Sequence, residues 1–162
     1  MNDLQTDGFK LANQLCFSVY NTSRLFTKFY QRALSDFGLT YSQYLVMMAL
    51  WEEGGRTLHQ IGEALYLESN TLTPVLRRME EAGWLTREKS PHDRRQLTAH
   101  LTERGRAAEA PIQKAIAACI GKEHLDIDQY KDAQATINQL EETLRTLLTD
   151  ESKMEDDNNG RL

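Results

Sequence analysis

The sequence predicts a mainly α-helical chain with one small β-hairpin. Long segments carry apolar residues at spacings of three, four and seven, the periodicity of one helix face. Residues 84–101 instead alternate apolar and polar residues on both sides of a turn cluster, which is typical of a hairpin. The 162 residues are enough for one domain with a real core.

The first expected helix covers residues 9–37, a stretch without Gly or Pro that Gly8 and Gly38 bracket. Its apolar stripe consists of Ala12, Leu15, Cys16, Val19, Phe26, Phe29, Tyr30, Ala33 and Leu34. A single helix of this span is about 43 Å long at about 1.5 Å per residue. Because that length exceeds a small domain, we expect much of the stripe to pack against a second subunit.

The segment 42–52 is strongly apolar and predicts a buried core helix, which Gly54 and Gly55 end. Thr57 is then a good N-cap for a short helix, with Gln60 at the capping-box position.

A further helix is expected from Ser69 or Asn70, either of which can cap it, to a stop at Gly83. Pro74 should fall within about the first turn, where its missing N–H costs little. The hairpin over 84–101 follows directly.

Thr102 is expected to cap the helix after the hairpin, and that helix should bend or break near Pro111. Either Asp126 or Asp128 opens the last helix. The C-terminal helices together span 103–149.

This order of elements, with two short helices followed by a basic hairpin, is that of a winged helix-turn-helix over residues 39–101. The long helices at 9–37 and 103–149 lie outside that unit and are expected to be dimerisation helices.

The net charge of −5 is unevenly distributed. Residues 150–162 hold five acids against two bases, and we expect this acidic tail to be disordered. Residues 84–106 hold six bases against three acids. Because local charge governs phosphate binding, an acidic chain with one basic region remains compatible with DNA.

Short polar side chains at the start of the helix that precedes the hairpin can meet phosphates or base edges, and two arginines follow. At the hairpin turn, two adjacent arginines suit the minor groove or nearby phosphates, and an aspartate can hold one of them in place. The candidate DNA-binding residues are Ser69, Asn70, Thr71, Thr73, Arg77, Arg78, Asp93, Arg94 and Arg95. A capped surface helix and a solvated charged turn are the alternative reading.

The stretch 39–105 resembles the MarR family of winged-helix regulators, with Asp93-x-Arg95 followed by the Leu-Thr-x-x-Gly motif at 101–105. Residues 14–17 (Gln-Leu-Cys-Phe), 39–45 (Leu-Thr-Tyr-x-Gln-Tyr-Leu) and 72–74 (Leu-Thr-Pro) resemble the organic hydroperoxide resistance repressors, the OhrR branch. The similarity covers about residues 11–149.

The resemblance implies that Cys16 is a peroxide-sensing thiol and that Tyr30 and Tyr41 hydrogen-bond it. Tyr30 lies about 21 Å from Cys16 along one helix at about 1.5 Å per residue, so a partner subunit must supply it. Tyr20 lies one turn from Cys16 and is a possible same-chain neighbour. The apolar stripe would favour organic hydroperoxides over hydrogen peroxide. The alternative is that Cys16 is a packed, inert small hydrophobe.

Some members of this branch carry a second cysteine that resolves the sulfenic acid as an intersubunit disulfide, and Cys119 falls in a similar place. Its apolar flanks suit simple helix packing equally well. The two cysteines form no zinc motif, and the four histidines are scattered over four elements. We therefore expect no metal, no cofactor and no enzymatic activity.

The composition, 40% hydrophobic and 27% charged, is that of a soluble globular protein. The sequence has neither a run of about 18 apolar residues nor a secretory signal, so we expect a cytoplasmic protein without a membrane span.

The sequence thus indicates a homodimeric repressor that binds a pseudo-palindromic operator and leaves it when organic hydroperoxide oxidises Cys16. The alternative is a MarR-type repressor relieved by reversible binding of a small aromatic ligand, with Cys16 a bystander. A thiol peroxidase that does not bind DNA is a third reading, against which the basic hairpin speaks.

Overall fold

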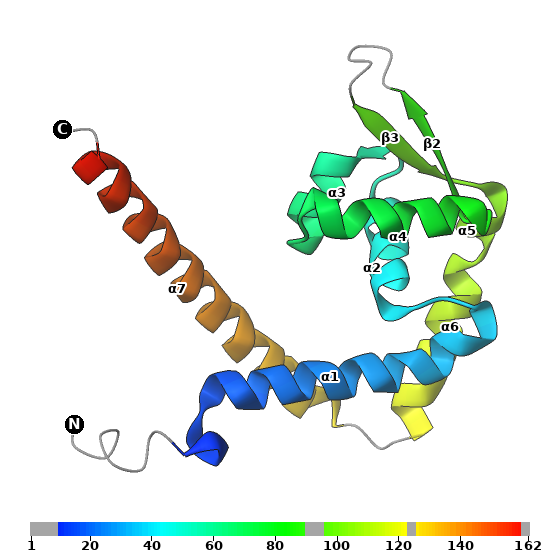
Figure 1. Ribbon diagram of the computed structural model, residues 1–162. Helices are drawn as coiled ribbons and strands as arrows, with labels where there is room; N and C mark the ends of the chain where they lie inside the picture. The colour runs from blue at the N-terminus through cyan, green and yellow to red at the C-terminus, as the bar shows by residue number, and fades with distance from the viewer. Residues whose placement is uncertain (1–9, 90–95, 123–125, 160–162) are drawn as a thin grey trace. The chain divides into compact units, whose positions relative to one another are not determined.

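The computed structural model describes residues 10–89, 96–122 and 126–159 and confirms a mainly helical chain with a small antiparallel sheet (Figure 1). The described elements, in chain order, are the 3-10 helix η1 (Leu11–Asn13), α1 (Leu15–Leu34), the 3-10 helix η2 (Ser35–Phe37), α2 (Tyr41–Glu52), β1 (Arg56–Thr57), α3 (Leu58–Leu65), α4 (Ser69–Glu81), β2 (Leu85–Lys89), β3 (Leu97–Leu101), α5 (Glu103–Ala107), α6 (Glu109–Lys122) and α7 (Ile127–Asn159).

The first helical stretch is shorter than the single helix expected over 9–37. α1 has 20 residues and lies between two 3-10 turns. Gln14 has an extended backbone that separates η1 from α1. At the other end Gly38 takes a φ of +66°, and the N–H of Leu39 returns to the carbonyl oxygen of Leu34 at 3.2 Å. This closure ends the helix in the way that a left-handed C-terminal residue commonly does.

Two capping boxes start α2 and α3. The Thr40 hydroxyl accepts from the N–H of Gln43, and the Gln43 side chain accepts from the N–H of Thr40. α2 therefore starts at Tyr41, one residue earlier than expected. Most of its apolar residues are buried as predicted, whereas Met48 is exposed. The predicted box of Thr57 and Gln60 is confirmed at the start of α3.

The expected N-cap of α4 at Ser69 or Asn70 is wrong. The carbonyl oxygen of Glu68 already accepts from two backbone N–H groups at 3.0 Å, so Glu68 is the N-cap, and its side chain makes no capping bond. Pro74 is then the sixth residue of α4, beyond the first turn, where it removes one intrahelical hydrogen bond. The predicted stop at Gly83 is confirmed, with a φ of +75°.

The predicted hairpin is confirmed as strands β2 and β3, which pair antiparallel with Leu85 opposite Leu101 (Figure 1). A third strand, β1, was not predicted. It pairs with β3 on the side away from β2, with Arg56 opposite Ala99. Two residues are too short to show an alternating pattern.

Thr102 caps α5 as predicted, because its Oγ1 accepts from the N–H of Gly105 at 3.1 Å. The interruption falls at Ala108, before Pro111. Asp126 opens α7, since its carboxylate accepts from the backbone N–H groups of residues 128 and 129.

α7 continues through residues 150–159, where we expected a disordered acidic tail. No Gly or Pro interrupts residues 122–159, so the backbone can continue the helix.

The core collects apolar side chains from the end of α1, from α2, α3 and α4, from the sheet and from α6. Its largest fully buried members are Leu34, Leu39, Val46, Met47, Leu50, Ile61, Leu72, Leu76, Met79, Leu85 and Ile112. The chain forms two compact units, 1–119 and 120–162.

Candidate functional site

The outward face of α4 carries the six candidate residues of this helix. The buried side of α4 consists of Leu72, Leu76 and Met79, each no more than 1% exposed. The exposed positions are Ser69, Asn70, Thr71, Thr73, Arg77 and Arg78. The helical period therefore places these predicted residues on one accessible surface.

The short polar side chains at the start of α4 are linked to one another. Thr73 Oγ1 donates to the carbonyl oxygen of Ser69 at 2.6 Å, and Thr71 Oγ1 donates to Asn70 Oδ1 at 3.2 Å. Asn70 Nδ2 in turn donates to Glu68 Oε2 at 3.1 Å. Such side chains offer hydrogen-bonding groups that can meet the edges of bases.

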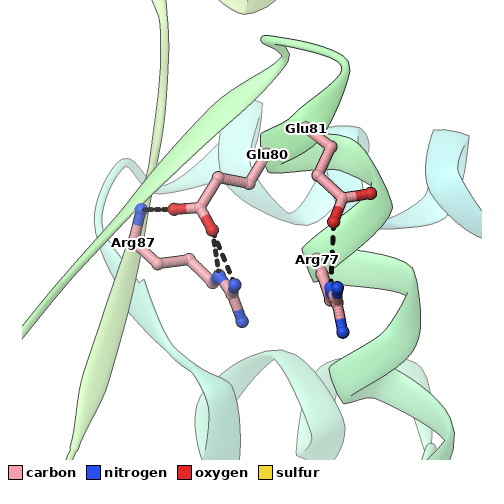
Figure 2. Close-up of polar contacts among 4 residues, drawn as sticks. All are labelled: Arg77, Glu80, Glu81 and Arg87. Atoms are coloured by element: carbon pink, nitrogen blue, oxygen red, sulfur yellow. Dashed lines mark hydrogen bonds and ion pairs between the residues drawn. The ribbon is translucent and has the colours of Figure 1, made fainter.

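The two arginines of α4 differ in their surroundings. Arg77 Nε donates to Glu81 Oε1 at 2.9 Å, one turn further along the helix (Figure 2). Both side chains are mostly exposed, and such pairs contribute little to stability. Arg78 has no ion pair with any residue of the described ranges. The positive charge of Arg78 is therefore the less neutralised of the two.

An ion pair between Glu80 and Arg87 joins α4 to the hairpin. Glu80 Oε1 accepts from the backbone N–H of Arg87 on β2 at 2.9 Å. Its Oε2 accepts from Nε at 2.9 Å and from Nη2 at 2.6 Å of the same guanidinium (Figure 2). Hydrogen bonding by the Arg87 side chain lowers the pKa of the Glu80 carboxyl. The pair fixes the orientation of the hairpin relative to α4.

Sequence reasoning missed this pair. Glu80 and Arg87 lie on different elements across the turn at Gly83, so no helical or strand spacing relates them. The remaining predicted DNA-binding residues, Asp93, Arg94 and Arg95, lie outside the described residues.

The two cysteines are free thiols. Cys16 is exposed at the start of α1, and its Sγ lies 4.0 Å from Gln14 Oε1. Cys119 is half-buried on α6. The hydroxyl oxygen of Tyr20 accepts from Arg24 Nη1 at 3.3 Å, and Arg24 also lies 5.6 Å from the Tyr20 ring centroid.

Tyr30 and Tyr41, both predicted as site residues, lie together. α1 and α2 bring their ring centroids to 5.3 Å. Cys16 is far from this pair within the chain, because α1 is unbroken and fourteen residues of helix span about 21 Å. One chain alone therefore does not bring the thiol and the two tyrosines together.

Two further aromatic residues of α2 extend this pair. Tyr44 lies 6.1 Å from Tyr30 and 6.3 Å from Trp51 between ring centroids. Burial raises the pKa of Tyr44, and the neighbouring Tyr41 raises it further. Sequence reasoning counted both residues as core of an apolar helix, since nothing in their spacing distinguishes a packed aromatic residue from a functional one.

Within the described ranges, His, Cys, Asp and Glu side chains form no group of three that could hold a metal ion. No helix of the described residues is long and apolar enough to cross a membrane.

Comparison with known proteins places these features in a family. Residues 39–97 match the model of the MarR family. The organic hydroperoxide resistance transcriptional regulator of Bacillus subtilis is 39% identical over 138 residues, which are 85% of this chain and 94% of that protein.

Two solved structures of AbfR, a protein of Staphylococcus epidermidis, are also similar. Reduced AbfR bound to DNA is 46% identical, has a TM-score of 0.80 and matches over 88% of this chain and 98% of that chain. Disulfide-formed AbfR is 44% identical, has a TM-score of 0.62 and matches over 91% and 99% of the two chains.

Proposed function

The chain belongs to the MarR family and is a transcriptional regulator, and from this premise we propose that it is a homodimeric repressor whose Cys16 senses organic hydroperoxides. In this proposal the reduced dimer binds a pseudo-palindromic operator and oxidation of Cys16 releases it. The observation that carries the proposal is the pairing of Tyr30 with Tyr41 at 5.3 Å, at the opposite end of α1 from an exposed Cys16.

The DNA-binding part of the proposal rests on the outward face of α4 and on the relatives. A two-fold dimer presents two such helices, so the half-sites should lie about one DNA turn apart. Arg78, which has no ion pair among the described residues, offers its charge to a phosphate or a guanine. The hydroxyls and the amide at the start of α4 offer groups for bases. AbfR, 46% identical, has been solved bound to DNA in its reduced form.

The dimer is supported by apolar side chains that each unit exposes. On α1, Leu15 is 61% and Leu25 is 57% exposed. On α7, Leu144, Leu147 and Leu148 are each at least half exposed. Such stripes on long helices are typical of surfaces that pack against another chain, and a second copy of this chain would cover them.

The chemistry at Cys16 follows from its exposure and from the partner's tyrosines. The thiolate sulfur attacks the terminal oxygen of the hydroperoxide, the O–O bond breaks, and the leaving alkoxide takes up a proton to become an alcohol. The sulfur is oxidised to sulfenic acid while the peroxide is reduced. Tyr30 and Tyr41 of one subunit would act as hydroxyl donors to Cys16 of the other, and Tyr20 is available on the same α1.

Cys119 is the candidate that resolves the sulfenic acid. Its thiol would attack the oxidised sulfur of Cys16 on the other subunit, forming a disulfide and releasing water. Both thiols are free and neither is fully buried. AbfR has been solved in a disulfide-formed state, which supports this assignment by analogy.

The decisive experiment replaces Cys16 by Ser, which nearly preserves volume and removes the oxidisable sulfur. Wild type and Cys16→Ser are compared by gel shift on the neighbouring intergenic DNA, with and without cumene hydroperoxide. Both should bind, only the wild type should leave, and dithiothreitol should restore its binding. If Cys16→Ser also leaves, the proposal fails and a repressor relieved by a reversible aromatic ligand becomes the better account.

A further inference from the structure

A continuous set of contacts leads from the tyrosine pair to the base of the hairpin. Tyr44 packs against both Tyr30 and Tyr41, with ring centroids 6.1 and 6.3 Å away. Trp51, two turns further along α2, contacts Tyr44 edge to face at 6.3 Å. Trp51 Nε1 then donates to the carbonyl oxygen of Gly105 on α5 at 3.0 Å. α2 therefore contacts α1 at one end and holds the segment after β3 at the other.

The backbone at Gly105 is itself fixed to the end of α4. A Cβ at this position would clash with the carbonyl oxygen of Trp84, so the close approach of the two backbones requires glycine here. Thr102 Oγ1 accepts from the N–H of Gly105 at 3.1 Å and donates to the carbonyl oxygen of Gly83 at 2.8 Å. Gly83 ends α4, so the carbonyl that Trp51 holds is tied to this helix.

These contacts lie in a tightly packed region. Tyr44 is 7% and Trp84 is 4% exposed. Packed interiors repack between discrete arrangements and do not deform smoothly, so a shift of one ring displaces the next. The Trp51 side chain is half-buried, and its indole N–H donates to this carbonyl oxygen. The loss of the acceptor of such a group is costly.

We propose that Tyr44 and Trp51 are positioning residues that couple the tyrosine pair to α4 and the hairpin. This inference rests on the proposed function and names the regulation of that site. A displacement of Tyr30 or Tyr41, when Cys16 of the other subunit is oxidised, moves Tyr44. That movement reaches Gly105 through the Trp51 hydrogen bond and alters the setting of α4 on DNA.

The test uses the indole N–H resonance of Trp51 in the full-length ¹⁵N-labelled protein. The chain has two tryptophans, so Trp84→Phe assigns the two indole resonances. Cumene hydroperoxide should shift the Trp51 resonance in the wild type and leave it unmoved in Cys16→Ser. Release of DNA by oxidised wild type with an unmoved Trp51 resonance would overturn the inference while the proposed function stands. Wild type that stays on DNA when oxidised would refute the proposed function, and the coupling with it.

A second measurement uses Trp51→Phe, which keeps an aromatic ring and removes the N–H donor. Its Cys16 should oxidise at the wild-type rate, because the change lies away from the thiol. The ratio of operator affinities between reduced and oxidised protein should fall by roughly fivefold, the size of one net hydrogen bond. Tyr130→Phe on α7 is the control, and the Trp51 resonance of the wild type decides the question if Trp51→Phe does not fold. An unchanged affinity ratio in a folded Trp51→Phe contradicts the proposal.

Discussion

The ion pair between Glu80 and Arg87 gives a prediction whose size can be worked out from its contacts. Glu80→Gln keeps the shape of the side chain and removes the charge. The amide oxygen can still accept from the backbone N–H of Arg87, but the amide nitrogen is itself a donor, so the two bonds from the guanidinium are lost. Such bonds contribute about 1.5–3 kcal/mol when shielded and about 0–1 kcal/mol when exposed.

Exposure decides between these two ranges. The Glu80 side chain is 36% and the Arg87 side chain is 20% exposed, so solvent screens the pair in part. We therefore expect Glu80→Gln to lower the free energy of unfolding by about 1 kcal/mol at pH 7. For a chain of this size that is a fall in Tm of about 2–4 °C. Urea and thermal unfolding at one fixed protein concentration measure it, since dimerisation makes stability concentration-dependent.

The pH dependence has a definite sign. Arg87 lowers the pKa of Glu80 below its ordinary value of 4.5. Folded protein therefore binds fewer protons at this site than unfolded protein does near that pH. The stabilisation is fully present above pH 4.5 and is lost as the pH falls through the lower folded pKa. The difference between wild type and Glu80→Gln should thus narrow below pH 4.5.

The neighbouring carboxylate supplies the control. Glu81 pairs with Arg77 within one exposed helix face, so Glu81→Gln should cost under about 0.5 kcal/mol. Equal losses in Glu80→Gln and Glu81→Gln, or a Glu80→Gln loss that does not change between pH 7 and pH 3, would refute the reasoning.

The other predictions concern DNA and the thiols. Arg78→Ala should weaken operator binding and reduce the slope of log affinity against log salt by about 1. Arg77→Ala should weaken binding less, because Glu81 partly neutralises the charge of Arg77. Fluorescence anisotropy over a salt series compares the two variants. Oxidised wild type should run as a covalent dimer on a non-reducing gel and Cys119→Ser as a monomer; a monomeric wild type carrying a small-thiol adduct would exclude the resolving role. Tyr41→Phe should bind DNA normally yet lose it more slowly after peroxide addition, as stopped-flow release would record.

Local sequence signals predicted the parts of the fold that local chemistry decides. The Thr57–Gln60 capping box, the stop at Gly83 and the Thr102 cap each need only a few neighbouring residues, and all three are confirmed. The start of α4 was misread because Ser69 and Asn70 have the side chains of N-caps, while backbone geometry put the cap at Glu68. Strand β1 was not predicted, because it forms only by pairing with β3, which is distant in the sequence.

The same distinction between local and distant contacts applies to the residues of the candidate site. Helical period sufficed to predict the outward positions on α4, and the resemblance to a family supplied Cys16, Tyr30 and Tyr41. Neither could supply Trp51, whose hydrogen bond reaches a residue 54 positions away. Contacts between distant elements depend on how the helices pack, and no spacing rule encodes them.

The two ends of α1 have different surroundings, and this difference explains why the proposed sensor needs two subunits. Leu15 and the neighbouring Cys16 lie on an exposed apolar stretch, whereas Ala33 and Leu34 at the other end are buried in the core of the same unit. In the proposed dimer, a second subunit that covers the exposed end would bring its own Tyr30 and Tyr41 with it, because its α1 and α2 hold these two residues together. In this proposal, oxidation of Cys16 changes a contact that two chains share. An altered contact of this kind must change the dimer interface or the packing around α2, and both of these bear on where the two α4 helices are held.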